Sequence, residues 1–188
     1  MAFDLSAGTY VNTSGTAISM EALSGGWYRC SFSANTEMLY MCVSDGTGSS
    51  SVTANGTDGI YIWGQQTEYG VPTEFIGVTT SAAVSVGPVS GLPRLDYLNS
   101  SCPRLILEPQ RTNLITYDSY YGTYTINNAT LASNVVTSPD GYQDASSITQ
   151  TNTTSGNISF PAISYTSGTT YTHSIFVKQG TKDFIVFT

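Results

Sequence analysis

Short strand-like segments separated by turn signals run the length of this 188-residue chain. No window sustains the 3.6-residue apolar period of an amphipathic helix. Residues that suit pleated strands are abundant, with 27 Thr and 13 Tyr, and Gly, Ser, Asn and Asp fill the intervening turns. The pattern predicts an all-β protein built from many short strands, a β-sandwich or jelly roll.

The expected strands fall into two regions on either side of a Pro-containing stretch. The first region has expected strands near 8–12, 17–22, 26–33, 37–44, 60–64 and 74–78. The second has them near 105–108, 113–117, 122–126, 134–137, 145–151, 156–162, 171–178 and 183–187. The stretch between them contains three prolines and little periodicity, which is typical of a linker or an extended crossing segment. We therefore divide the chain into 1–80, a Pro/Gly/Ser-rich connector at 81–104, and 105–188.

The charge of the chain argues against several classes of partner. Charged residues make up 10% of the sequence and the net charge is −7, whereas a nucleic-acid-binding protein needs a basic surface to neutralise phosphates. An anionic membrane surface would be repelled in the same way. No apolar run approaches the roughly 18 residues that a membrane-spanning helix requires. We therefore expect no nucleic-acid partner and no membrane insertion.

The residues that most often carry catalysis are scarce. The single histidine, His173, alternates with Tyr171 and Ile175 and is expected on a strand face, either packed or facing solvent. It supports neither a Ser-His-Asp or Cys-His site nor a zinc site. Of the three cysteines, Cys30 and Cys42 lie on neighbouring expected strands, where they could face each other or serve as small buried hydrophobic residues. Cys102 lies in the connector.

Acidic residues were considered for two kinds of site. A glycosidase needs two carboxylates held about 5–10 Å apart, and the candidate pairs are Glu68 with Glu74, Asp140 with Asp144, and Asp45 with Asp58. All are expected in Gly-rich or Pro-rich turns, where acids are ordinary turn formers, so we expect no enzyme. Structural calcium is an option in the loops at 44–48 and 55–59, since calcium prefers oxygen ligands. No other metal or cofactor is expected.

Glycan binding would require exposed aromatic rings flanked by hydrogen-bonding groups. The candidates are Trp27, Tyr28, Tyr61, Trp63 and the run at 117–124. Within that run, Tyr120, Tyr121 and Tyr124 lie in a Gly-containing loop and are expected to be exposed. The same tyrosines would also suit a protein interface. The alternation around Trp63 and Trp27 favours burial of both indoles on a core-facing side of a strand.

Several motifs resemble segments of known proteins. "PRLDY" (93–97) followed by "LILEPQRTNLITY" (105–117) resembles a segment that recurs in bacteriophage tail-fibre, head-fibre and other virion surface proteins. In those proteins a jelly-roll domain similar to a carbohydrate-binding module follows. Its early half is similar to "SPDGYQDAS" (138–146) and "SGTTYTHSIFVKQGTKDF" (167–184), and its late half to "GGWYRCSFS" (25–33) and "DGIYIWGQQTEYGVPTEFI" (58–76).

The resemblance implies that residues 1–80 are a late half and residues 105–188 an early half of such a domain. The two halves would pair within one chain, giving a permuted jelly roll, or between chains of an oligomer. Alternatively the sequence is a piece of a longer fibre. Strand-like residues at both ends imply edges that need a partner. Within the connector motif, Glu108, Arg111 and Asn113 would have an architectural role.

The function implied is that of a non-enzymatic virion structural protein, a fibre, adaptor or decoration subunit on the surface of a phage particle. Its partners would be other virion subunits, with a homo-oligomer expected and a trimer favoured, and a host-surface glycan. The alternative is a carbohydrate-binding module of a secreted bacterial protein. A glycan-degrading enzyme is a third reading, which lacks a convincing acid pair.

Overall fold

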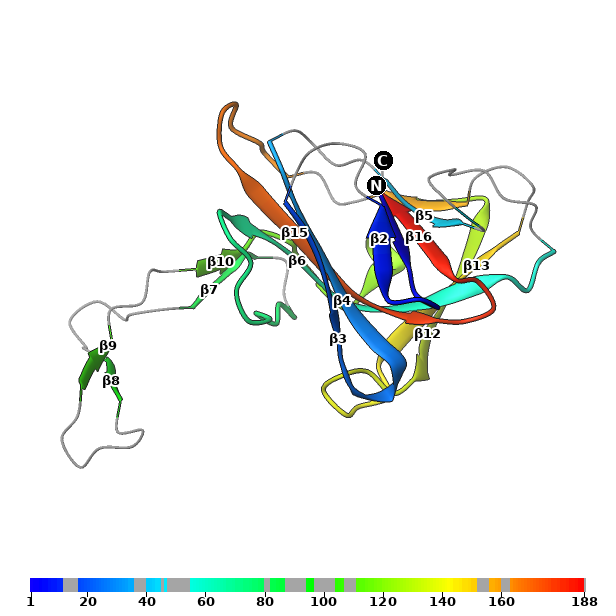
Figure 1. Cartoon of the computed structure of the whole chain (residues 1–188), viewed down its shortest axis with the longest axis horizontal. Helices are drawn as coiled ribbons and strands as arrows, with labels where there is room; N and C mark the ends of the chain where they lie inside the picture. Colours follow the sequence, from blue (N-terminus) through cyan, green and yellow to red (C-terminus); the bar gives the residue numbers. More distant parts are fainter. Residues whose placement is uncertain are drawn as a thin grey trace.

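The computed structural model is a β-sandwich of two antiparallel sheets with six strands each, as the sequence pattern predicts (Figure 1). It describes residues 1–11, 17–35, 40–44, 46, 55–79, 82–86, 94–96, 104–106, 111–151, 156–159 and 163–187. Sheet A has the strand order β11 (Ile126–Asn127), β14 (Asn157–Ser159), β5 (Tyr40–Ser44), β16 (Phe184–Phe187), β1 (Ala2–Asp4), β2 (Thr9–Val11). Sheet B has the order β12 (Ala129–Val136), β13 (Ala145–Gln150), β6 (Gly59–Tyr69), β15 (Tyr171–Gln179), β4 (Trp27–Ala34), β3 (Ile18–Ala22).

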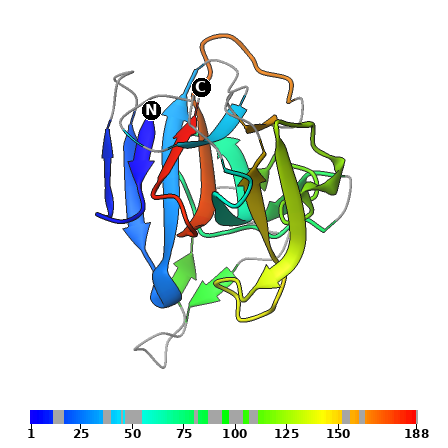
Figure 2. The ribbon, with the colours of Figure 1, turned by 90° about the vertical axis from the view of Figure 1, so that its right-hand side faces the viewer.

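Each sheet draws three strands from residues 1–80 and three from residues 105–188. The first and last strands of the chain, β1 and β16, are direct neighbours, with Phe3 opposite Ile185. The N-terminal ammonium of Met1 donates to the carbonyl of Phe187 over 3.1 Å. Figures 1 and 2 show the N and C labels side by side. The strand edges at the two ends of the chain therefore pair with each other, and the two regions close one sandwich within a single chain.

The interior of the sandwich follows the alternation of its strands. In β15, His173, Ile175 and Val177 face inward, and all three are almost fully buried. The interior cluster takes residues from both sheets, including Phe3, Phe32, Ile60, Ile62, Ile148, Ile158, Ile185 and Phe187. Burial of such side chains contributes roughly 25 cal/mol per Å² of apolar surface, so this interior is the main source of stability.

A second apolar cluster covers the outer face of sheet B. Phe176 alternates with the inward residues of β15 and packs with Trp27 and Trp63, while Phe75 covers the group. Trp27 is 2% exposed and Trp63 is 6% exposed. The expectation that both indoles are buried is therefore right, but they are buried outside the sandwich interior.

Strand β6 is longer than the expected strand at 60–64 because a β-bulge lets it continue. Its register with β15 shifts between Ser174 and Phe176, and Gly64 at this point has a φ of +58°. An L-residue rarely adopts that conformation, whereas glycine does so freely. The bulge carries β6 on to Tyr69. By contrast, no strand forms at 74–78, where the described backbone is irregular.

The connector is not a simple linker in the described residues. Backbone pairing joins β7 (Val84–Val86) to β10 (Arg111–Asn113), and β8 (Arg94–Asp96) to β9 (Arg104–Ile106). Both ribbons are antiparallel. The first remains attached to the sandwich, because β10 packs against β6, whereas the β8–β9 ribbon lies away from the sandwich (Figure 1). We call the β8–β9 ribbon the arm.

Helical structure in the described part of the chain is confined to two 3₁₀ turns, η1 (Ser24–Gly26) and η2 (Tyr121–Thr123). No helix among these residues has the length and apolar character needed to cross a membrane.

Candidate functional site

A cavity of about 350 Å³ lies beside the outer cluster of sheet B. Its volume falls within the range of about 300–1,000 Å³ that is usual for small-molecule sites. Aromatic rings and carboxylates share its walls, which are formed by Trp63, Phe75, Gly77, Val78, Thr79, Tyr117, Asp118, Ser119, Tyr120, Asn134, Asp140 and Asp144. Trp63 and Tyr120, which are both sequence candidates for glycan binding, therefore line the same cavity.

The bulge in β6 positions the indole wall. Trp63 immediately precedes Gly64, and its ring centroid lies 4.7 Å from that of Phe75 and 5.2 Å from that of Phe176. A Cβ on Gly64 would lie 2.9 Å from Phe176 and 3.1 Å from Phe75. Only glycine therefore allows Phe75 to lie against Trp63 and form one side of the cavity.

The tyrosines of the 117–124 loop divide between surface and core. Tyr120 is 56% exposed and its ring meets that of Tyr117 edge to face, with centroids 6.2 Å apart. Tyr121 and Tyr124 are 1% and 9% exposed and pack against each other in the interior cluster. Burial raises the pKa of both phenols. The expected exposure is thus right for Tyr120 and wrong for Tyr121 and Tyr124, because turn η2 directs those two rings inward.

Asp118 ties the floor of the cavity to β6. It is 3% exposed, and its carboxylate accepts hydrogen bonds from the Val78 N–H at 2.5 Å and the Ser119 hydroxyl at 2.7 Å. Its backbone donates to the carbonyl of Val78 and accepts from the N–H of Gln65. Burial raises the pKa of the Asp118 carboxyl, partly offset by these hydrogen bonds. Both oxygens are committed to holding neighbouring segments.

Asp140 and Asp144 lie in the expected "SPDG" turn region. The Asp140 carboxylate accepts from the hydroxyl of Ser138 and from the N–H of Tyr142, so it is a turn former as expected. Asp144 differs, because its Oδ1 is enclosed by protein and has no hydrogen-bond partner among the described residues. The indole Nε1 of Trp63 is in the same condition. Two residues that line the cavity therefore each carry a buried polar atom, one donor and one acceptor, with no partner within the described part of the chain.

A network of buried hydrogen bonds joins two of the sequence motifs. Asn113, which is 0% exposed, donates to the carbonyls of Gln65 and Ile76 over 3.2 and 3.0 Å. Its Oδ1 accepts from the N–H groups of Thr67 and Ile115, both over 3.1 Å. The "RTNL" motif is thereby fixed to the strand that carries "YIWGQQTE". Asn113 has the architectural contacts that the resemblance implies.

Glu68 belongs to the same network and corrects one expectation. It lies in β6 rather than in a turn, and it is 1% exposed. Its carboxylate accepts from the N–H and hydroxyl of Thr73 and from the amide of Gln66, each over 2.7 Å. Its carboxylate therefore stabilises the local fold, and Glu68 does not line the cavity.

The other connector residues are only partly described. Arg111 donates from Nη1 to the carbonyl of Tyr69 over 3.0 Å, at the end of β6. Glu108 lies outside the described residues, as does Cys102.

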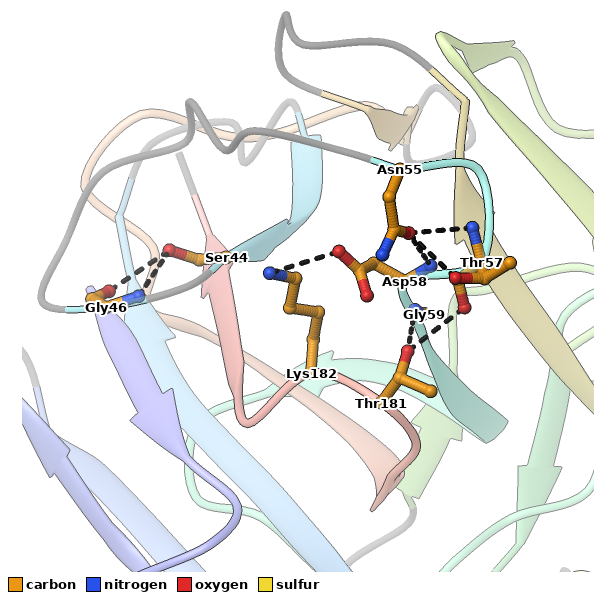
Figure 3. Close-up of polar contacts among 8 residues, drawn as sticks. All are labelled: Ser44, Gly46, Asn55, Thr57, Asp58, Gly59, Thr181 and Lys182. Carbon is orange, nitrogen blue, oxygen red and sulfur yellow. Dashed lines mark hydrogen bonds and ion pairs between the residues drawn. The ribbon is translucent and has the colours of Figure 1, made fainter.

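The calcium candidate at 55–59 has its oxygen ligands engaged in protein contacts (Figure 3). Asn55 Oδ1 accepts from the N–H and hydroxyl of Thr57 and from the N–H of Asp58. The Asp58 carboxylate forms an ion pair with Lys182 at 3.2 Å. Among the described residues no group of three or more acidic, His or Cys side chains is arranged to hold a metal. The other candidate loop lies mostly outside them, Asp45 included.

Cys30 and Cys42 are buried and lie in different sheets, so they do not face each other across neighbouring strands. Cys30 lies in the interior cluster, where burial raises its pKa. His173 is also in the interior, 1% exposed and stacked on Phe32. None of the three lies at the cavity.

Sequence reasoning missed part of the cavity. Phe75 and Asn134 come from segments that only the three-dimensional arrangement brings to it, whereas Tyr117 and Asp118 belong to the same loop as Tyr120. The signal that could have suggested Asp118 is its position directly after the "EPQRTNLITY" motif. Comparisons of the chain with protein-family models, with curated proteins and with solved structures found no match.

Proposed function

We propose that this chain is a non-enzymatic structural subunit on the surface of a phage particle, a fibre, adaptor or decoration protein, and that its cavity contacts a host-surface glycan. Its sandwich would be a jelly roll of the carbohydrate-binding-module type, permuted in the order of its halves. The virion assignment rests on the resemblance of the connector and "YIWGQQ" motifs. The glycan assignment rests on the cavity.

The single observation that supports glycan contact is the combination of groups in the cavity wall. Sugar rings present C–H faces that pack on aromatic rings, and Trp63, Phe75, Tyr117 and Tyr120 supply such rings. Sugar hydroxyls require hydrogen-bonding groups placed around that contact, and three carboxylates and one amide side chain supply them.

The state of the carboxylates favours binding over hydrolysis. A glycosidase needs one carboxyl group to donate a proton and a second to act as nucleophile or base. Asp118 accepts from Val78 and Ser119, and Asp140 accepts from Ser138 and Tyr142, so both already stabilise the local fold. Asp144 alone does not make a catalytic pair.

The arm supports the assembly part of the proposal. Two-stranded ribbons are marginally stable on their own in water, and β8 and β9 form such a ribbon away from the sandwich (Figure 1). Outer strand edges of this kind readily pair with another chain. We take the occupant to be a second copy of this chain, within the expected homo-oligomer, for which a trimer is favoured.

A panel of immobilised bacterial surface polysaccharides and oligosaccharides tests the glycan contact. The wild-type chain should be retained by at least one member, and Tyr120→Ala should lose at least tenfold in affinity because it removes an aromatic wall. Tyr10→Ala is the matched control, since Tyr10 is 44% exposed but lies on β2 at the edge of sheet A. A folded wild-type chain that no glycan retains would contradict the proposal.

Immunogold labelling with antibodies against this chain, applied to purified phage particles from a bacterial culture that produces the chain, tests the virion assignment. Label on the particle surface is the expected result. Chain recovered solely from a particle-free culture medium would instead favour the carbohydrate-binding module of a secreted bacterial protein.

A further inference from the structure

We propose that the cavity beside Trp63 takes a single neutral sugar ring and discriminates against sugars that carry a carboxylate or other anionic group. This inference rests on the proposed glycan contact and specifies its ligand class. It is carried by the size of the cavity, the charge of its walls and its unpaired hydrogen-bonding atoms.

The size argues for one ring. At about 350 Å³ the cavity lies near the lower end of the range for small-molecule sites. Its aromatic lining comes from two segments of the chain, with Trp63 and Phe75 in one and Tyr117 and Tyr120 in the other. An extended oligosaccharide would therefore place one terminal unit in the cavity and leave the rest outside.

The charge argues for a neutral ligand. Three carboxylates line the cavity, from Asp118, Asp140 and Asp144, and none of the lining residues that the structure describes is Lys, Arg or His. A ligand carboxylate close to one of these groups would be repelled, and more strongly than in bulk water because the effective dielectric constant near a protein surface is lower. A hydroxyl group meets no such repulsion and can donate a hydrogen bond to a carboxylate.

The unpaired atoms argue for hydroxyl chemistry in particular. Trp63 is 6% exposed, and its Nε1 donor and the Asp144 Oδ1 acceptor have no partner among the described residues. A buried polar atom without a partner is unfavourable, because it has lost its hydrogen bonds to water and gained none from the protein. A sugar hydroxyl both donates and accepts, so it can satisfy either atom. Because protein encloses both atoms, the exposed turn at 138–144 must shift slightly as the ring enters.

Matched pairs of sugars test the inference. Methyl glucoside and methyl galactoside are titrated by NMR in parallel with methyl glucuronide and methyl galacturonide, which differ from them by a carboxylate at C6. At least one neutral sugar should bind at least tenfold more tightly than its acidic counterpart. The ratio should fall in Asp140→Asn, which removes a charge but keeps an oxygen acceptor for Tyr142, and it should also fall at high salt.

The outcomes separate the inference from the proposal beneath it. Equal affinities for the neutral and acidic members, or tighter binding of an acidic member, would overturn the inference and leave glycan contact intact. Neutral sugars whose affinity is unchanged in Tyr120→Ala would bind elsewhere and would also overturn it. If none of the four sugars and no member of the polysaccharide panel binds, the proposed glycan contact itself is rejected.

Discussion

At the scale of single residues, Asn113 uses every hydrogen-bonding position of its amide inside the protein. Its two donors meet the carbonyls of Gln65 and Ile76, and its oxygen accepts from Thr67 and Ile115. Asn113→Ala would leave these four buried backbone groups without partners, each at a cost of about 1–3 kcal/mol before relaxation. We predict a loss of at least about 3 kcal/mol in the free energy of unfolding, measured by urea denaturation.

The control for this prediction is Asn127→Ala, because exposed Asn127 makes a hydrogen bond to Asn157 at the surface. It should change the free energy of unfolding by less than about 0.5 kcal/mol. Equal effects of the two substitutions would contradict the structural role assigned to Asn113.

His173 should make the stability of the chain depend on pH. It lies 2.9 Å from the hydroxyl of Thr67 through Nδ1, and burial lowers its pKa from 6.5 to about 4. Between these two pH values the unfolded chain binds one more proton than the folded chain, so the free energy of unfolding falls as the pH falls. The loss is about 1.4 kcal/mol per pH unit and on the order of 3 kcal/mol in all.

The measurement is a series of denaturation curves between pH 7 and pH 4 for the wild type and for His173→Phe. Because the chain has one histidine, the wild-type curve minus the variant curve isolates its contribution. A difference that stays constant across this range would mean that His173 is not buried in its neutral form.

At the scale of elements, many of the strands could be predicted from the sequence, but their pairing partners could not. The alternation in "YTHSIFV" and "WYRCSF" indicates strands and their two faces, because side chains point to opposite sides at every step, and β15 and β4 follow it. Nothing in the sequence indicates that β4 belongs to sheet B while β5, which follows it, belongs to sheet A. Sheet membership depends on packing between distant segments.

In the candidate site, too, residue types could be read from the sequence, but burial and contacts between distant segments could not. Trp63 and Tyr120 could be proposed from their residue type alone, whereas the burial of Tyr121 and Tyr124 depends on turn η2 and on the interior it packs against. None of the carboxylate pairs that the sequence offers includes Asp118, yet the cavity joins Asp118 to the 138–144 turn.

The bulge in β6 makes a prediction about Gly64. Gly64→Ala places a Cβ at a φ of +58° and within 3.1 Å of two phenylalanine rings, so it combines backbone strain with overlap. Gly168→Ala has a similar φ of +81° but no neighbour within 4 Å. We predict that Gly64→Ala lowers the free energy of unfolding by about 3 kcal/mol and Gly168→Ala by about 1 kcal/mol. If urea denaturation shows that the two substitutions lower the free energy of unfolding equally, the contacts around Gly64 do not require glycine at the bulge.

At the scale of the whole molecule, the arm is a two-stranded ribbon that belongs to neither sheet of the sandwich, so we expect it to be stabilised by a second chain. Leu95 pairs with Leu105 across the β8–β9 ribbon. Leu95→Pro removes a backbone donor and disrupts the ribbon, while Leu95→Val keeps the donor. We predict by light scattering that the wild type and Leu95→Val are oligomers and that Leu95→Pro has the single-chain mass, with the circular dichroism of the sandwich retained.

A wild-type chain that is itself monomeric would remove the assembly role from the arm. An oligomer that persists in Leu95→Pro would mean that another surface makes the contact between copies.

The central claim is that a glycan binds in the cavity beside Trp63, and tryptophan fluorescence tests it most directly. The chain has two tryptophans, and Trp27 lies in the outer cluster without lining the cavity. In Trp27→Phe the emission therefore reports on Trp63 alone. We predict a saturable change in that emission on titration with a glycan that the panel retains, with an affinity reduced at least tenfold by Tyr120→Ala. A glycan that binds with no change in Trp63 emission would contradict the account.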